Sequence, residues 1–269
     1  MSASVYTHGH HESVLRSHSW RTAENSAQYL LKYLKPDMHI LDIGCGPGTI
    51  TADFALLVPQ GTVVGLETGP DVLEKAKEFA DKRGITNLSF IIGDACNLAY
   101  PDNTFDVVHA HQVLQHLGDP VQALREMRRV TKPGGIVAAR DADTDAMTWY
   151  PEIKGLYEWR KLYSQVARSN GGEPNAGRRL HVWAHQAGFD RESITCSTGT
   201  WCYGTIEERS WWANLWADRT LNSTFAVSAI EKGHATQEEL DRIAKIWRDW
   251  GRDEDAWFAL LHGEIVCRV

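Results

Sequence analysis

The feature that most constrains the fold is the segment LDIGCGPGTIT, residues 41–51, in which an apolar run leads directly into a cluster of glycines. Glycine weakens regular structure, so such a cluster indicates a backbone that turns sharply or lets another group come close. The residues before it read as a short buried strand, and those from Thr49 to about Val58 have helical spacing. A strand, a glycine-rich turn and a helix N-terminus together form the general cradle for a nucleotide. A turn needed only for packing is the alternative.

The alternation of strand and helix continues through the first half of the chain. Helical patterns separate the β-rich runs, and a further helical pattern over residues 22–34 precedes the first strand and ends before Pro36. Five strands that alternate with helices across residues 38–140 predict βαβ units, a parallel sheet and right-handed crossovers. The runs that follow the glycine loop are TVVGLE (62–67), NLSFIIGD (87–94), TFDVVHAH (104–111) and IVAAR (136–140), with helices expected at 70–84 and 119–135.

Beyond Arg140 this rhythm changes. Helices are expected at 151–170, 175–189, 208–220 and 237–250, and strands at 193–203 and 258–269. The second half is therefore expected to hold the last strands of the sheet together with helical insertions. It also carries most of the eleven tryptophans.

The composition excludes several classes of protein. The net charge of −7 argues against a broad nucleic-acid surface, and no apolar stretch approaches the roughly 20 residues that cross a bilayer. The N-terminus lacks the apolar core of a secretory signal, so we expect a cytoplasmic protein. The five cysteines are scattered without C-x-x-C spacing, and neither a disulfide framework nor a zinc site is predicted.

The charges around the glycine loop narrow the choice of ligand. Asp42 lies directly before the loop, and Glu67 ends the second strand about twenty residues further on, where a carboxylate can accept hydrogen bonds from both ribose hydroxyls. A carboxylate at Asp42 would repel a pyrophosphate but suits a ligand with an ammonium group. The loop is also compressed, G-x-G-x-G rather than G-x-G-x-x-G. Together these features favour S-adenosylmethionine (SAM), which carries an amine and a cationic sulfur.

Several ordered motifs in residues 20–145 resemble the class I SAM-dependent methyltransferases, in particular the small-molecule group that includes the ubiquinone and menaquinone C-methyltransferases. The matching segments are LDIGCGPGT, VVGLE, IIGDACNLAYPDNTFDVVHAHQVLQHLGDP and LREMRRVTKPGGIVAARD. The resemblance implies an α/β, Rossmann-like, doubly wound fold. Its mostly parallel seven-stranded sheet would have helices on both faces and a helical cap insertion. The implied division is an N-terminal lid (1–22), a SAM-binding core (23–145) and the remaining strands with the substrate cap (146–269), in one continuous domain.

The resemblance also implies roles for particular residues. Asp42 would receive the methionine amine, Glu67 would bind the ribose, and Asp94 would accept a hydrogen bond from the adenine amino group. S-adenosylhomocysteine (SAH) would be the product. The cofactor-binding residues implied in this way are Asp42, Gly44, Cys45, Gly46, Gly48, Glu67, Thr68, Asp94, Ala95, Cys96 and His111, with Arg21 as a candidate for the cofactor carboxylate.

Methyl transfer from a sulfonium needs alignment and exclusion of water, and a general base only when the acceptor arrives protonated. His111 is the first candidate for a catalytic group, because the resemblance implies that it lies where the fourth-motif residue of the family borders the sulfonium; a structural histidine is the alternative. Asp141 after the fifth strand is a second candidate base or substrate contact. It belongs to RDADTD, which either binds Mg²⁺ or, as we favour, forms a solvated turn. His109, His111 and His116 have no acid or cysteine close in sequence, so we expect no metal.

The acceptor is expected to be a small molecule that is bulky and largely apolar or aromatic. Tryptophans of the second half either wall its pocket or form the core of the cap or a homodimer interface: Trp149, Trp183, Trp201, Trp211, Trp212 and Trp216. Arg178 and Arg179 either recognise an acidic group or are surface charge. Two other functions stay open, a methyltransferase acting on protein or RNA and a SAM-binding regulatory subunit without activity. No membrane span and no nucleic-acid partner are expected.

Overall fold

The computed structural model describes residues 20–269, so most of the segment expected to form a lid (1–22) lies outside the described residues. The strands are β1 (His39–Ile43), β2 (Thr62–Glu67), β3 (Leu88–Ile92), β4 (Phe105–His111), β5 (Thr131–Ala142), β6 (Thr148–Tyr150), β7 (Ile194–Tyr203) and β8 (Trp257–Arg268). The helices are α2 (Ala23–Leu31), α3 (Thr49–Leu57), α4 (Pro70–Lys82), α5 (Pro120–Val130), α6 (Lys154–Ser169), α7 (Leu180–Gln186), α8 (Ile206–Asn222), α9 (Thr224–Glu231) and α10 (Gln237–Trp250).

The strands between residues 20 and 269 form one eight-stranded sheet. Its order runs β3-β2-β1-β4-β5-β8, with all pairs from β3 to β5 parallel and β8 antiparallel to β5. Strand β7 pairs with β8 along its whole length, while β6 pairs with the start of β8 on the edge that β5 also uses. This is a doubly wound, mostly parallel sheet, as the sequence predicts, and the short strand β6 adds to the seven strands that were expected.

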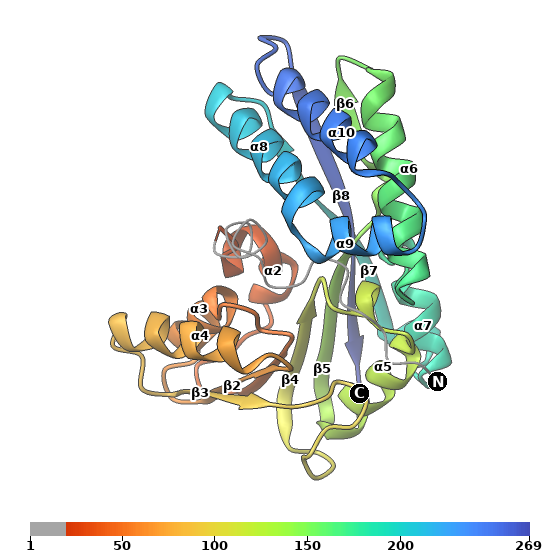
Figure 1. Ribbon diagram of the computed structural model, residues 1–269. Helices are drawn as coiled ribbons and strands as arrows, with labels where there is room; N and C mark the ends of the chain where they lie inside the picture. The colour runs from red at the N-terminus through yellow and green to blue at the C-terminus, as the bar shows by residue number, and fades with distance from the viewer. Residues whose placement is uncertain (1–19) are drawn as a thin grey trace.

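Helices cover both faces of the sheet (Figure 1). Helices α2, α3 and α4 lie on one face, and α5 and α7 lie on the other. Each layer has its own apolar core. Leu30, Ile40 and Phe54 belong to the first core, and Leu124 and Phe189 belong to the second. The strands between them are apolar on both sides, as buried parallel strands must be.

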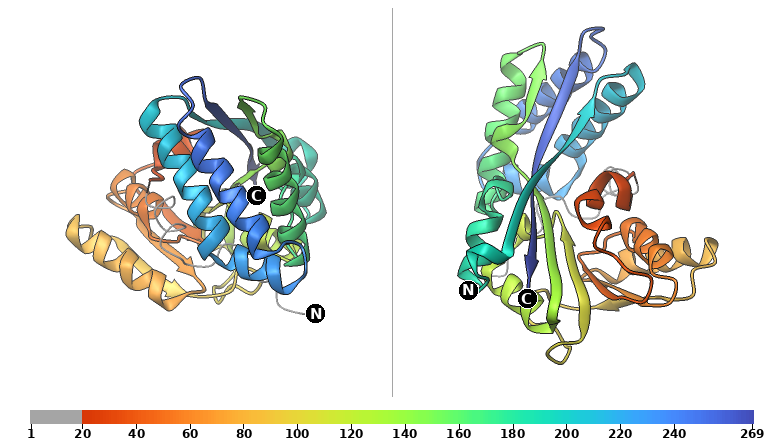
Figure 2. Two further views of the ribbon diagram at one scale, coloured as in Figure 1. Left: turned by 45° about the horizontal axis from the view of Figure 1, so that its top comes forward. Right: turned by 180° about the vertical axis from the view of Figure 1, so that it is seen from behind.

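A helical cap stands beyond one end of the sheet. Helices α6, α8, α9 and α10 gather around the part of β8 that extends past β5 (Figures 1 and 2). A third apolar core fills the cap, and its largest members are indole rings: Trp149, Trp159, Trp201, Trp212, Trp216, Trp247 and Trp250. Seven of the tryptophans are therefore core residues of the cap.

The structure differs from the sequence expectations at several elements. The helix expected to reach Gly135 ends at Val130, and residues Thr131–Ala142 form one long strand that begins before the expected IVAAR segment. Helix α9 and strand β6 were not expected. Helix α9 has only eight residues, too few to show a clear helical repeat of apolar positions. In the part of the chain that is described, no helix is long and apolar enough to cross a membrane.

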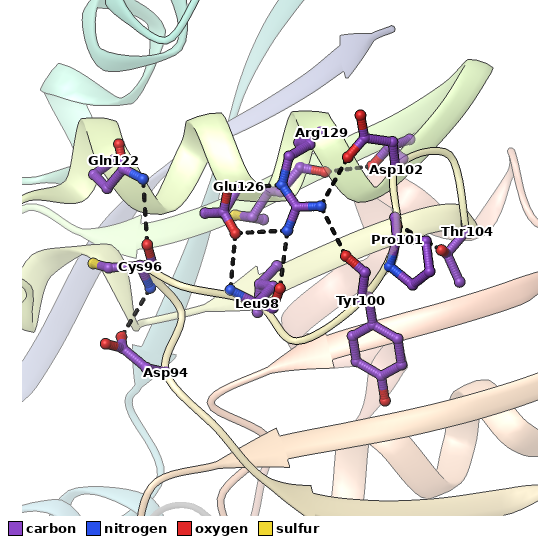
Figure 3. Close-up of polar contacts among 12 residues, drawn as sticks. Asp94, Cys96, Leu98, Tyr100, Pro101, Asp102, Thr104, Gln122, Glu126 and Arg129 are labelled. Atoms are coloured by element: carbon purple, nitrogen blue, oxygen red, sulfur yellow. Dashed lines mark hydrogen bonds and ion pairs between the residues drawn. The ribbon is translucent and has the colours of Figure 1, made fainter.

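An ion pair on α5 holds the segment that follows β3. Arg129 donates hydrogen bonds to Glu126 and to the carbonyl oxygens of Leu98 and Tyr100, and Glu126 accepts the backbone N–H of Leu98 (Figure 3). The hydrogen bond from Arg129 lowers the pKa of the Glu126 carboxyl below its usual range. This clamp fixes the backbone at Leu98 and Tyr100, a few residues after the turn at Asp94.

Replacing Arg129 by methionine should destabilise the fold by about 1–3 kcal/mol, because several charge-assisted hydrogen bonds are lost while the stem still packs. Chemical denaturation measures the change in the free energy of unfolding. Arg125→Met is the matched control on the same helix: this arginine is exposed and donates one hydrogen bond, to the Gln186 carbonyl. Its effect should stay within about 0.5 kcal/mol. Equal losses in the two variants would contradict the clamp.

Candidate active site

A cavity of about 230 Å³ lies at the carboxyl ends of the parallel strands. Such an edge is where ligands bind in open α/β sheets. The turns after β1, β2, β3 and β4 each contribute residues to the wall. The lining residues are Arg21, Asp42, Ile43, Gly44, Cys45, Gly46, Pro47, Thr49, Ile50, Leu66, Glu67, Thr68, Val72, Asp94, Ala95, His111, Gln112, Val113, His116 and Leu117.

The glycine loop turns in a conformation that other residues rarely adopt. Gly44, Gly46 and Gly48 have φ of 63°, 53° and 77°, all in the left-handed region. A Cβ at Gly44 would lie 2.4 Å from a methyl group of Val113, so the loop after β4 also requires glycine there. Gly48 does not line the cavity among the residues described; it is the N-cap of α3 and faces Ala76 and Phe90. Its part in the site is to start the helix.

Asp42 is almost fully buried at the base of this loop. One carboxylate oxygen lies 2.7 Å from Nδ1 of His109 on β4, and the other accepts the Thr51 hydroxyl at 2.6 Å. The two partners come from neighbouring elements, so they fix the orientation of the carboxylate at the wall of the cavity. Each oxygen keeps acceptor capacity for a further donor.

Glu67 connects the tip of β2 to the glycine loop. One oxygen accepts the Gly46 backbone N–H at 3.1 Å, and the other accepts the backbone N–H and hydroxyl of Thr68 at 2.8 and 3.1 Å. Glu67 and Thr68 both line the cavity, so the structure places this carboxylate beside that of Asp42 on the same edge of the sheet.

The turn after β3 brings two of its three expected residues to the site. Asp94 and Ala95 line the cavity, and a carboxylate oxygen of Asp94 accepts the Cys96 backbone N–H at 2.8 Å (Figure 3). Cys96, in contrast, does not line the cavity in the described part of the chain. Its sulfur lies 3.7 Å from the Asp119 carbonyl oxygen, because the turn directs this side chain toward α5.

His111 ends β4 and lines the cavity. It is 6% exposed, and neither ring nitrogen has a hydrogen-bond partner in the described chain. Burial, then the charges of Arg21 and Arg140, lower the pKa of His111 well below its usual value. The ring is therefore neutral, with one N–H donor and one acceptor nitrogen. His116, on the same wall, has its pKa lowered to about 3, mainly by burial.

Asp141 does not reach the cavity wall in the described part of the chain. It is fully buried on β5, where one oxygen accepts the Gln115 backbone N–H at 3.2 Å and the other has no partner among the residues described. Burial raises the pKa of Asp141 to about 8. The side chain is thus a support for the loop that carries His116, rather than a group in contact with the cavity.

The expectation of a solvated turn at RDADTD is wrong, because β5 continues through Ala142 and the first two aspartates are buried. Asp143 accepts a bidentate pair of hydrogen bonds from Arg178 at 2.5 Å, and Arg179 pairs with Glu173 at 3.4 Å. Both arginines are about half exposed and hold the segment before α7. They therefore serve as structural partners of acids in this chain.

Where the structure is described, no group of three or more His, Cys, Asp or Glu could hold a metal ion.

A second, smaller cavity of about 40 Å³ adjoins the first on the side of the cap. Seven of its fifteen lining residues are aromatic. The lining residues are Trp20, Arg21, Gln112, Gln115, Ala142, Thr144, Met147, Tyr163, Trp201, Tyr203, Trp211, Trp212, Trp216, Arg219 and Leu260. Of the tryptophans expected at an acceptor pocket, four line this cavity. Trp149 packs in the cap core, and Trp183 packs on the other face of the sheet.

Arg21 and Gln112 belong to both cavities and mark the boundary between them. Arg21 donates to the Gln112 side-chain oxygen at 2.9 Å, and its guanidinium lies 5.5 Å from the ring centre of Trp201. The Gln112 amide nitrogen lies 2.8 Å from Nε2 of His262, and Arg140 lies 3.1 Å from the other nitrogen of that ring. A chain of polar contacts therefore runs from the boundary into the centre of the sheet.

Sequence reasoning missed Gln112 and His262. Gln112 has φ of 54°, a left-handed conformation that a glutamine rarely adopts and that no pattern in HAHQVLQH indicates. His262 is a fully buried imidazole within the largely apolar run FALLHGEIV, and a histidine in such a run was the available signal.

Comparisons with known proteins agree with this arrangement. A family model described as a methyltransferase domain matches residues 34–216. The chain is 41% identical to an uncharacterised methyltransferase of Schizosaccharomyces pombe over 97% of this chain and 95% of that protein. It is 29% identical to a demethylmenaquinone methyltransferase of Staphylococcus haemolyticus over 62% of this chain and 77% of that protein. The solved structure of the YcgJ protein from Bacillus subtilis shares the fold, with a TM-score of 0.58, 20% identity, and coverage of 91% and 99%.

The buried Asp141 predicts a specific pH dependence of stability. Its pKa is raised in the folded state, so the folded protein holds a proton that the unfolded chain has released between about pH 4 and pH 8. This contribution to stability is complete below the unfolded pKa and is lost as the pH rises through the folded one. Asp141→Asn removes the titration. The unfolding free energy of the wild type should therefore fall relative to the variant by up to about 1.4 kcal/mol per pH unit in that window.

Denaturant titrations of both proteins at pH 5 and pH 8 measure this difference. Asp190→Asn, at an exposed position before β7, is the control and should run parallel to the wild type. A constant difference between wild type and Asp141→Asn at the two pH values would show that Asp141 is ionised in the folded protein.

Proposed function

This chain belongs to the class I SAM-dependent methyltransferases, and we propose that it transfers the methyl group of SAM to a small, largely apolar or aromatic acceptor held in the aromatic cavity. The observation that carries the proposal is the pair of adjoining cavities: one is lined by the carboxylates of Asp42, Glu67 and Asp94, and the other has indole rings in its wall. Arg21 and Gln112, which belong to both walls, lie where the two ligands would meet.

The first cavity fits SAM by the chemistry of its donor set. The oriented carboxylate of Asp42 suits the methionine amine, and Glu67 suits the ribose hydroxyls. Asp94 and the backbone of Ala95 suit the adenine edge. The N-terminus of α3 faces the cavity at Thr49 and Ile50, and a helix N-terminus favours the cofactor carboxylate. When bound, SAM supplies an electrophilic methyl group on a cationic sulfur.

The chain's own residues would position the reactants rather than exchange protons with them. His111 is neutral and weakly basic, so we assign it to orientation of the ligands by hydrogen bonding and contact, not to proton abstraction. Asp141 would hold the loop after β4 in place. The aromatic wall would exclude water from the path of the methyl group, which strengthens electrostatic interactions in the site.

The rings of the second cavity favour a planar aromatic group on the acceptor. Trp201, Trp211, Trp212 and Trp216 line it together with Tyr203, and aromatic walls gain stacking and edge contacts with aromatic ligands. The demethylmenaquinone methyltransferase similar to this chain acts, by its name, on a quinone precursor, which is consistent with an aromatic acceptor. The helical cap around β8 would then be the part of the chain that selects the acceptor.

Binding of SAH to purified protein tests the cofactor half of the proposal. Asp42→Asn should weaken SAH binding about 10- to 100-fold in calorimetry, because a charge-assisted hydrogen bond contributes about 1.5–3 kcal/mol. Glu67→Gln provides a second variant in case the buried Asp42 is needed for folding. Asp37→Asn, an exposed change at the opposite end of β1, should bind SAH as the wild type does. Full affinity in both site variants would remove these carboxylates from the site.

Turnover separates the proposed enzyme from the alternatives. With labelled SAM and a panel of phenols, quinols, sterols and thiols, an aromatic acceptor should produce SAH and a labelled small molecule. Label that appears only in protein or RNA would indicate a macromolecular methyltransferase. SAH binding with no transfer to any class of acceptor would indicate a regulatory subunit.

A further inference from the structure

Strand β7 lies at an edge of the sheet and has none of the usual protection of an edge strand. Among the residues that the structure describes it pairs with β8 alone, in continuous register from Ile194 to Tyr203. Edge strands are usually short or carry lysine, proline or a bulge, because their free backbone groups can pair with another chain. The β7 sequence ITCSTGTWCY has no charged residue and no proline. Its outer row of backbone N–H and C=O groups therefore suits a further strand.

The exposed side chains of β7 are symmetric about Gly199. Thr198 and Thr200 flank this glycine, Cys196 and Cys202 lie two positions further out, and all four are exposed. They share one face of the strand, because side chains alternate between the two faces. If a second copy pairs antiparallel with the two glycines opposite each other, each threonine meets a threonine and each cysteine meets a cysteine. A twofold contact needs such a surface, because residue i meets residue j while j meets i.

A groove of about 720 Å³ lies beside this edge, between β7 and α2. On the α2 side its wall includes Glu24, Gln28 and the C-cap residue Lys32. The three are spaced by four along the chain, and all are exposed. Opposite charges therefore stand at the two ends of this wall, with an amide between them. Such a wall is complementary to itself when a second copy of α2 lies antiparallel to the first.

One twofold axis would satisfy both the strand and the helix. The Trp201 indole donates to the Asn25 carbonyl oxygen at 2.9 Å near the end of β7. At the start of β7, the Arg268 guanidinium lies 5.2 Å from the ring centre of Tyr33. Helix α2 therefore runs antiparallel along β7, and its middle, at Gln28, lies level with the middle of the strand. An axis through the centre of β7 would thus bring the acid at one end of α2 toward the lysine at the other end of the partner's α2.

We propose that β7 and α2 form a twofold interface between two copies of this chain. The two β7 strands pair antiparallel across Gly199 into one continuous sheet, and Glu24 of each copy pairs with the partner's Lys32. The occupant is a second copy because each of these groups meets its complement only across that axis. Trp20 and Trp201 line both the groove and the second cavity, so the interface adjoins the proposed acceptor site. The dimer itself does not depend on the proposed function.

Analytical ultracentrifugation of the full chain tests the association. At micromolar concentration we expect about twice the chain mass of 30.2 kDa. The double variant Thr198→Lys/Thr200→Lys places lysine opposite lysine at both central pairs. Like charges directly opposite are destabilising, so the dimer dissociation constant should rise at least about tenfold. The double variant Thr198→Lys/Thr200→Glu is the matched control: it changes the same exposed positions but places lysine opposite glutamate, and it should stay a dimer.

The cysteines of β7 report the register. Oxidation with copper phenanthroline should join Cys196 of one copy to Cys202 of the other, because opposite Cα atoms in an antiparallel pair lie within the span of a disulfide. Cys196→Ser and Cys202→Ser should each lose this crosslink when oxidised alone. A mixture of the two variants should recover it, since mixed dimers keep one pair of facing cysteines. Mass spectrometry of the linked peptides identifies the two residues.

A monomer at high micromolar concentration overturns the proposal, as does a dimer to which the two double variants respond alike. A crosslink between identical cysteines overturns the pairing at Gly199. Hydrogen exchange that finds the outer β7 amides protected in a monomer would show that another segment of the same chain covers the edge, and it also overturns the proposal. If the double variants do not fold, the wild-type mass and crosslink decide. SAH binding and turnover test the proposed function separately.

Discussion

Parallel pairing of β1 with β2 and β4 is the constraint on which the site depends. The register places Asp42 opposite Gly65 on one side and His109 on the other. A Cβ at Gly65 would lie 2.6 Å from the Phe90 ring, so only glycine leaves room for that ring beside β2. The bond between Asp42 and His109 then joins β1 to β4 in the buried interior. With Thr51 as its second partner, the Asp42 carboxylate connects two strands and the helix that follows the glycine loop.

The helical cap is connected to this sheet through strand β8. Strand β8 runs antiparallel beside β5 and continues past it, so it carries the cap above the carboxyl edge of the sheet (Figure 1). The indole rings that fill the cap are therefore next to the cavity that the strand ends form. Arg21 and Gln112 lie at this junction, and His262 on β8 connects Gln112 to Arg140 on β5. Strands β4, β5 and β8 therefore set the positions of both cavities and of the residues between them.

The parallel sheet and the carboxylates at its edge could be predicted from the sequence because local patterns determine them. The alternation of strands and helices fixed the parallel sheet, and a carboxylate at the end of each of two neighbouring strands must come to one edge. Asp42 and Glu67 were predictable for that reason. The side-chain directions in turns were not: Cys96 faces α5 because of the turn at Asp94, and Asp141 supports a loop because β5 is longer than its apolar run. Gln112 and His262 meet only through tertiary contact between segments 150 residues apart.

The central claim is that a sulfonium nucleoside and its acceptor occupy two cavities that share the boundary at Arg21 and Gln112. A crystal structure of the protein with SAH bound tests this most directly. The account predicts the ribose within hydrogen-bonding distance of Glu67, the amine beside Asp42, and the sulfur facing the aromatic cavity. A bound SAH whose sulfur is separated from that cavity by the loop after β4, or whose ribose lies away from Glu67, would contradict it.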